Sequence, residues 1–156
     1  MRISLSDNAL ERGKLGDIRA VMAHELGHYV LNHPMEGVMQ LGLVLVAGFA
    51  FLSRGFSVVW RRWGGHWGVR DAGDVAGLPI FVALFAAYLF IATPVINTII
   101  RTNEAEADVF ALNASREPHG RARTAMMHGE DRKIDPGRFE EWLFFDHPSA
   151  RSRVSM

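Results

Sequence analysis

LPIFVALFAAYLFIATPVINTII, residues 78–100, carries no formal charge over its whole length. As an α-helix this stretch is about 34 Å long, which is enough to cross a hydrocarbon core of about 30 Å. A second uncharged stretch, GVMQLGLVLVAGFAFL, occupies residues 37–52. We therefore predict two transmembrane segments, at about residues 37–53 and 78–100. The alternative is a pair of buried core helices in a soluble protein.

The composition narrows the classes of site and partner. The chain has 156 residues, 17 basic and 17 acidic, and no cysteine. The balance of charge argues against a nucleic acid partner. Without cysteine, a zinc site must use histidine and carboxylate ligands. The length suits a single, fragment-like region over residues 1–156, and the two segments predict an integral membrane protein in contact with the lipid bilayer.

The stretch HELGH, residues 24–28, precedes the first hydrophobic segment and is an H-E-x-x-H motif. Asp17 is a candidate N-cap for the helix that carries it. Residues four apart share a helical face, so His24 and His28 can bind one zinc ion. Glu25 then has the position of the general base that activates water for attack on a peptide carbonyl. The alternative is a surface helix that carries two histidines by chance.

Residues 101–113, RTNEAEADVFALN, follow the second hydrophobic segment and are expected to continue its helix. A catalytic zinc takes three protein ligands and water, and Glu104 is the best candidate for the third, because a membrane hairpin can return it to the first helix. Asp108 shares the face of Glu104 and can hold a ligand histidine by its second nitrogen. Glu106 points about 160° away from Glu104. His33 lies off the ligand face, and we expect it to make a structural hydrogen bond.

The rest of the chain completes a mostly α-helical architecture. It comprises the H-E-x-x-H helix, two transmembrane helices and a C-terminal helical segment, with at most a short N-terminal strand. The alternation of Arg2–Leu5 predicts that strand, residues 53–77 read as an interfacial connection, and residues 118–128 and 138–145 read as short helices. For the acidic residues after the second segment, the alternative is a solvated helix face that pairs with Arg101.

Three stretches resemble the type I CAAX prenyl endopeptidases, which are integral-membrane zinc metalloproteases of the gluzincin type. The stretches are HELGHYVLNH (24–33), PVINTIIRTNEAEAD (94–108) and FFDHPSARSR (144–153). They occur in the order that the family shows and span nearly the whole chain. Members of the family carry further membrane helices upstream, so the resemblance implies that this chain corresponds to their C-terminal catalytic part.

The resemblance also implies roles for individual residues. It implies that His24, His28 and Glu104 bind one Zn²⁺ ion and that Glu25 is the catalytic base.

It further implies that Asp108 supports the zinc ligands from behind and that His147 stabilises the oxyanion beside the substrate carbonyl. Arg153 would brace the site through an ion pair, with Asp108 as the candidate partner. By the same resemblance, the active site faces the cytoplasm.

The expected function is hydrolysis of peptide bonds in a peptide or protein substrate, which is prenylated for the eukaryotic relatives. One alternative is a quality-control protease that degrades misfolded membrane proteins. Another is a catalytically inactive membrane scaffold in which the metal joins two helices. Glu25 favours a protease, because a structural zinc site needs no base and normally closes its fourth position.

Overall fold

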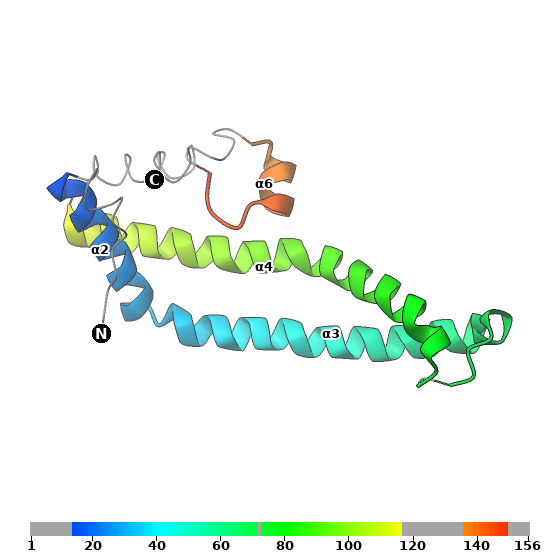
Figure 1. Ribbon diagram of the computed structural model, residues 1–156. Coiled ribbons are helices and arrows are strands. Elements are labelled where there is room, and N and C mark those ends of the chain that lie inside the picture. The colour runs from blue at the N-terminus through cyan, green and yellow to red at the C-terminus, as the bar shows by residue number, and fades with distance from the viewer. Residues whose placement is uncertain (1–13, 72, 117–135, 150–156) are drawn as a thin grey trace. The chain divides into compact units, whose positions relative to one another are not determined.

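The computed structural model describes residues 14–71, 73–116 and 136–149. The predicted strand at Arg2–Leu5, the predicted helix at residues 118–128 and Arg153 lie outside them. The regular structure of the described residues is helical, which confirms the mostly-α prediction (Figure 1). The elements are α2 (Leu15–Val30), α3 (His33–Trp63), α4 (Leu78–Ser115) and α6 (Arg138–Phe144), with the 3₁₀ turns η1 (Gly64–Trp67) and η2 (Val75–Gly77) between α3 and α4.

Helix α2 begins three residues earlier than the sequence predicted. Its N-cap is Lys14, and Asp17 occupies the third helical position rather than the cap. The Asp17 carboxylate accepts a hydrogen bond of 2.8 Å from the Lys14 backbone N–H. A carboxylate in the first turn is favoured both by this bond and by the positive end of the helix dipole. The prediction of Asp17 as N-cap is therefore wrong, although this residue does stabilise the helix start.

Two residues, Leu31 and Asn32, separate α2 from α3, and Asn32 shapes the turn between them. Its φ is 61°, in the left-handed region that asparagine tolerates better than most residues. The Asn32 carbonyl then accepts hydrogen bonds from the N–H groups of Met35 and Glu36 and so starts α3. Pro34 lies in the first turn of α3, where its missing N–H costs nothing. Helix α2 thus ends at Val30, before this proline, and is not kinked by it.

Helix α3 continues ten residues beyond the point where the sequence predicted a connection. It ends at Trp63, and the chain turns at Gly64. A Cβ on Gly64 would lie 2.4 Å from Cδ1 of Trp60, so a larger residue there would displace the Trp60 ring. The Trp60 indole N–H donates to the carbonyl of Val69 and closes the turn. Residues 53–63 contain no helix breaker apart from Gly55, which explains why the expected connection forms only after them.

Helix α4 runs without interruption from Leu78 to Ser115 and includes Pro94. The prediction that residues 101–113 continue the second hydrophobic helix is confirmed. An uninterrupted helix carries the chain from the uncharged segment directly into the polar residues that follow it.

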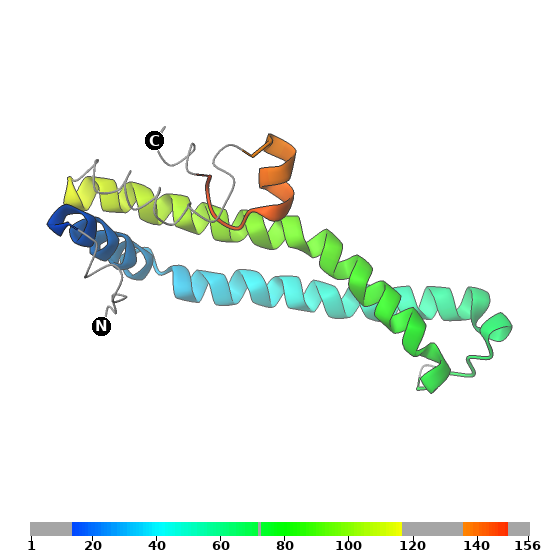
Figure 2. The same cartoon turned by 45° about the horizontal axis from the view of Figure 1, so that its top comes forward.

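The chain divides into two compact units, 38–96 and a second made of the residues on either side of it. In the first unit, α3 and α4 form an antiparallel hairpin (Figures 1 and 2). The Tyr88 hydroxyl donates to the carbonyl of Val44 in α3. The Tyr88 ring also packs on Gly48, where a Cβ would come within 2.7 Å of it. Small residues at such contacts let membrane helices approach closely.

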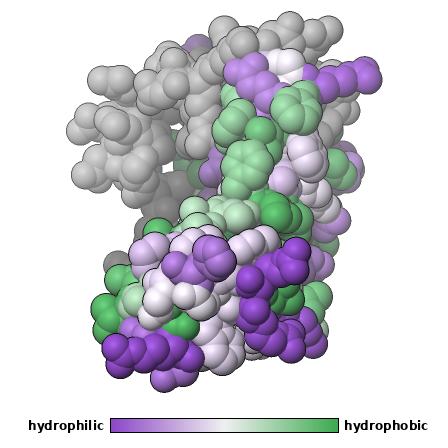
Figure 3. Space-filling view, turned by 90° about the vertical axis from the view of Figure 1, so that its right-hand side faces the viewer, coloured by the Kyte–Doolittle hydropathy of each residue, from purple (hydrophilic) through white to green (hydrophobic). Residues whose placement is uncertain are grey.

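The apolar side chains of this hairpin are mostly exposed. In the apolar windows of its two helices, only 6% and 11% of the residues are buried. Val46, Phe49 and Phe90 each expose about two thirds of their surface. Core helices of a soluble protein would bury these side chains, so the exposure favours helices surrounded by lipid. Figure 3 looks onto the connection end of the hairpin, where hydrophilic side chains gather beside hydrophobic ones.

In the other unit, α2 packs closely against the C-terminal part of α4. Ala20 on α2 and Ala107 and Ala111 on α4 are buried, with exposed fractions of 4%, 0% and 2%. A Cβ on Gly27 would lie 3.1 Å from the Phe110 ring and 3.3 Å from the backbone of Ala107. Small residues on both helices therefore bring their backbones together, next to the histidines of α2.

Candidate metal centre

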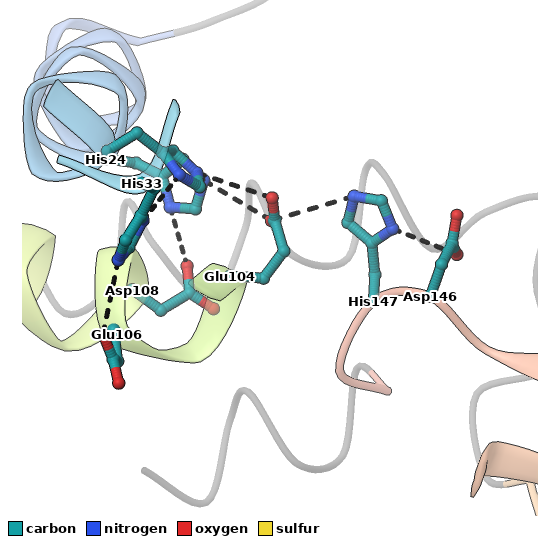
Figure 4. Close-up of polar contacts among 8 residues, drawn as sticks. His24, His33, Glu104, Glu106, Asp108, Asp146 and His147 are labelled. Carbon is teal, nitrogen blue, oxygen red and sulfur yellow. Dashed lines mark hydrogen bonds and ion pairs between the residues drawn. The ribbon is translucent and has the colours of Figure 1, made fainter. Parts of the chain in front are cut away.

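The Nε2 atoms of the two α2 histidines, His24 and His28, lie close to a carboxylate from α4. The Nε2 atoms of His24 and His28 are 3.1 Å apart. His24 Nε2 lies 3.5 Å from Oε2 of Glu104, and His28 Nε2 lies 3.4 Å from Oε1 of the same residue. All three side chains are partly buried. The structure therefore brings together the three residues that the sequence predicts as ligands. Figure 4 labels two of them, His24 and Glu104.

These distances fit a single small metal ion. Ligand atoms that surround a metal tetrahedrally at about 2.1 Å lie about 3.4 Å from one another. The two Nε2 atoms are 3.1 Å apart, and each lies 3.4–3.5 Å from a different oxygen of the Glu104 carboxylate, so the separations are close to that length. Two imidazoles and one carboxylate also form a ligand set that catalytic zinc sites use, with the fourth position left open. The residues present thus fit one zinc-sized ion.

Asp108 holds His24 from the side opposite the ligand atoms. Its Oδ1 atom lies 3.1 Å from His24 Nδ1, and the Asp108 side chain is only 6% exposed. Burial alone would lower the pKa of His24, but the hydrogen bonds and negative charges of Asp108 and Glu104 outweigh it and raise that pKa to about 9. Two carboxylates that stabilise an extra proton here also favour a bound metal cation.

Glu25 follows His24 directly on α2 and is exposed to solvent. A residue one step from the first histidine and three from the second projects beside the ligand face of the helix. Its position on the helix agrees with the expected role of a base beside the metal, and its side chain is open to water.

Helix α6 is anchored to α4 through backbone groups near its C-terminus. The Arg101 guanidinium donates to the carbonyls of Glu141 and Phe145, at 3.0 and 2.7 Å. The Asn97 side chain donates to the carbonyl of Leu143 at 2.8 Å. Arg101 therefore caps this helix end, which favours a cation. The expected alternative, an acidic helix face paired with Arg101, is not what these contacts show.

His147 follows α6 and points toward the same carboxylate that faces the α2 histidines. Its Nε2 atom lies 3.7 Å from Oε2 of Glu104, and its Nδ1 atom lies 3.1 Å from Oδ1 of Asp146 (Figure 4). The His147 side chain is 44% exposed, so it borders the metal position on a side that is open to solvent. The contact between His147 and its neighbour Asp146 was not predicted from the sequence.

Four polar residues of α4 form one stripe along the helix. Asn97, Arg101, Glu104 and Asp108 are spaced by four, three and four residues, the pattern of a single helical face. The first two contact α6, and the last two contact the histidines of α2. We refer to these four residues as the polar stripe of α4.

The pair His33 and Glu106 lies behind the ligands and was not predicted as a pair. His33 is 4% exposed, and its Nδ1 atom lies 2.9 Å from Nδ1 of His28. Its Nε2 atom lies 3.3 Å from Oε2 of Glu106. The sequence predicted a structural hydrogen bond for His33 and none for Glu106. Their approach depends on the left-handed conformation of Asn32, and the helical spacing carries no signal of it.

An H-E-x-x-H helix with a glutamate from a second helix defines the class of helical metallopeptidase centres. The sequence pattern of Peptidase family M48 matches residues 1–156, and the chain belongs to this family. Two relatives are similar over nearly the whole chain. The uncharacterized metalloprotease YhfN of Bacillus subtilis (strain 168) is 28% identical over 156 residues, which are 98% of this chain and 36% of the relative.

The second relative, CAAX prenyl protease 1 homolog of Oryza sativa subsp. japonica, is 28% identical over 160 residues, with 99% of this chain and 36% of the relative covered. The fold is also similar to the crystal structure of S. mikatae Ste24p, with a TM-score of 0.70 and 21% identity over 99% of this chain and 38% of that one. The resemblance to the prenyl endopeptidases is thus confirmed. The chain spans about 36% of the length of these two relatives.

Proposed function

We propose that this chain forms the catalytic part of a membrane-embedded zinc metalloendopeptidase. The observation that carries the proposal is the convergence of His24, His28 and Glu104, each of which offers one ligand atom within 4.8 Å of the other two. Membership of Peptidase family M48 and the exposed apolar hairpin support it. Glu25, which directly follows His24 and is exposed to solvent, argues against an inactive scaffold, because a structural zinc site needs no base.

The residues divide the work of peptide hydrolysis among themselves. When bound, zinc supplies a Lewis acid that polarises the scissile carbonyl. Glu25 takes a proton from the attacking water and delivers it to the leaving amine. His147 donates a hydrogen bond from Nε2 to the oxygen that gains negative charge. Asp108 accepts the Nδ1 proton of His24, which leaves Nε2 free to bind the metal.

The first test separates the base from the ligands. Glu25→Gln should reduce peptide hydrolysis at least 100-fold and retain zinc, because it removes the base but no ligand. Glu104→Ala should lose zinc, since only two of the three protein ligands remain. Asp71→Ala, in the connection between α3 and α4, is the control and should retain both. Zinc content by mass spectrometry and peptide cleavage are the measurements. Full activity in Glu25→Gln would refute the proposed role of Glu25.

We propose a prenylated protein or peptide as the substrate. The name of the Oryza sativa relative and the sequence resemblance support this choice. The competing substrate is a misfolded membrane protein. Cleavage rates on one peptide with and without a farnesyl group, and on an unfolded membrane protein, distinguish the two. A preference of tenfold or more for the farnesylated peptide is expected. Faster degradation of the unfolded protein would favour the quality-control alternative.

We propose further that the metal centre lies on the cytoplasmic side of the membrane. A hairpin of two spans leaves its connection on the opposite side from its outer ends. The chain has no cysteine, so single cysteines can report the topology. A cysteine replacing Gly65 in the connection should react with a membrane-impermeant maleimide in intact cells, and one replacing Ser115 should not. The reverse pattern would place the centre outside.

A further inference from the structure

Behind the ligand His28, the structure shows a continuous path of polar contacts. His28 Nδ1 lies 2.9 Å from Nδ1 of His33, and His33 Nε2 lies 3.3 Å from the carboxylate of Glu106. Both distances are of hydrogen-bond length, and the two are the described polar contacts of the His33 ring. The far end of the path is 54% exposed at the Glu106 side chain, whereas the His33 side chain is 3% exposed. A buried histidine therefore joins a metal ligand to a surface carboxylate.

Only one arrangement of protons satisfies this path when His28 binds a metal through Nε2. The bound nitrogen carries no proton, so the Nδ1 of His28 carries one and donates it to His33 Nδ1. His33 must then hold its own proton on Nε2, which faces the acceptor Glu106. Each donor meets an acceptor without any change in the observed distances. The path thus corresponds to a carboxylate–histidine–metal triad in which a second histidine lies between the carboxylate and the ligand histidine.

The backbone between the two histidines is shaped to close this path. On an uninterrupted helix, a residue five positions after His28 would be turned about 140° from it. After α2 ends at Val30, Asn32 takes a φ of 61° directly before His33, where α3 begins. The turn returns the His33 ring to His28, and the ring centroids lie 5.0 Å apart. The left-handed conformation of Asn32, which most residues adopt rarely, therefore places His33 behind the ligand His28.

We infer that His33 and Glu106 are positioning residues of the metal centre, which fix the tautomer and the orientation of His28. The inference rests on the proposed binding of zinc by His28. The Nδ1 atom of His24 contacts the carboxylate of Asp108 directly. The Nδ1 atom of His28 instead contacts His33, which in turn contacts a carboxylate. The acceptor for the Nδ1 proton is thus a carboxylate oxygen for His24 and an imidazole nitrogen for His28.

The test compares two substitutions of nearly equal shape in the full chain. The side-chain oxygen of His33→Asn can take the place of Nδ1 and accept the His28 proton, whereas His33→Leu cannot. We expect His33→Leu to weaken zinc binding 10–100-fold and His33→Asn to weaken it less than fivefold. Affinities come from chelator competition, and helix content by circular dichroism checks the fold. Equal losses in the two variants would show a packing role and overturn the inference.

If the His33 variants fail to fold, a second pair of variants at Glu106 and an NMR measurement on the wild-type chain still test the inference. Glu106→Gln retains an acceptor for the His33 proton, and Glu106→Ala removes it. Because Glu106 is half-exposed and water can replace it, the loss for Glu106→Ala should be only about two- to fivefold. In the zinc-loaded chain, ¹⁵N NMR should show His33 as the neutral tautomer protonated at Nε2. The Nδ1–H tautomer would overturn the inference.

The outcomes separate this inference from the proposed function. A wild-type chain that binds no zinc contradicts both. A wild-type chain that binds zinc, with His33→Leu and His33→Asn equal to it in affinity and in the visible spectrum of the cobalt-substituted form, contradicts the positioning role alone.

Discussion

At His24, a proton and a metal ion compete for one nitrogen. The pKa of this residue is about 9, so the metal-free chain carries a proton there at pH 7. Zinc binding must displace that proton, and the affinity should therefore rise up to about tenfold per unit between pH 7 and 8.5. Calorimetry in two buffers of different ionisation enthalpy should detect the release of about one proton at pH 7. Binding without proton release would contradict the raised pKa.

Asp108→Asn provides the matched control for this measurement. The amide keeps the size of the side chain and an acceptor for the His24 N–H, but it removes a negative charge. The pKa of His24 should fall, because the charge of Asp108 is one of the causes that raise it. Fewer protons are then released at pH 7, while zinc affinity drops about 10–100-fold through the lost support. An unchanged proton count would exclude Asp108 as a cause.

The candidate ligands were predictable from the sequence for a simple geometric reason. His24 and His28 share a face by helical spacing, and Glu104 follows the segment that returns the chain. The structure brings them together, and their roles as ligands stay predictions. The contact of His33 with Glu106 could not be predicted, because it requires the reversal of φ at Asn32. Periodicity describes regular helices and does not describe what happens where they break.

At the scale of the elements, Gly27 controls how closely α2 approaches α4. A methyl group there would lie 3.3 Å from the backbone of Ala107, which cannot rotate away. Gly27→Ala should therefore destabilise the unit by about 1–3 kcal/mol and lower zinc affinity. Gly37→Ala is the control, because apart from its own helix backbone and chain neighbours no described atom lies within 4 Å of its Cβ position. In that helix it should be neutral or stabilise by up to about 1 kcal/mol.

Thermal unfolding in detergent, followed by circular dichroism, measures both effects. Equal midpoints for the two alanine variants would contradict the close packing at Gly27.

Helix α6 depends on Arg101 for its position. Arg101→Ala removes the donors to the carbonyls of Glu141 and Phe145 and should leave zinc content unchanged. Peptide hydrolysis should fall about tenfold, because His147 follows this helix. Arg101→Lys should recover only part of the activity, since one ammonium group cannot reproduce the planar fork. Faster hydrogen exchange in residues 138–147 reports the loosened helix. Unchanged exchange in Arg101→Ala would contradict the anchoring role.

The helices themselves were easier to predict than their ends. The uncharged segments and the continuation of the second one to residue 113 followed from composition and pattern. The start of α2 was missed because Asp17 stabilises a helix equally well at the third position as at the cap. The end of α3 could not be predicted from charge, because the arginines of residues 53–63 continue the helix and the chain turns only at Gly64.

On the scale of the whole molecule, the exposed apolar hairpin predicts insertion into a membrane. Val46, 64% exposed in α3, should face lipid, and Val46→Arg should hinder insertion by about 2–3 kcal/mol. Val75→Arg is the matched control, because Val75 is 82% exposed in the connection before α4. Resistance to carbonate extraction measures insertion. Equal extraction of the two variants would indicate that water, not lipid, surrounds the hairpin.

The polar stripe of α4 also limits which changes of length the chain can accept. Asn97 and Arg101 hold α6, and Glu104 and Asp108 face α2, so two attachments share one helical phase. Inserting one residue between Arg101 and Glu104 would turn the second pair by about 100° relative to the first and advance it by about 1.5 Å. Insertions there should be rejected even where most substitutions of the exposed Thr102 are accepted. The spacing of this stripe, as much as its residues, is part of the centre.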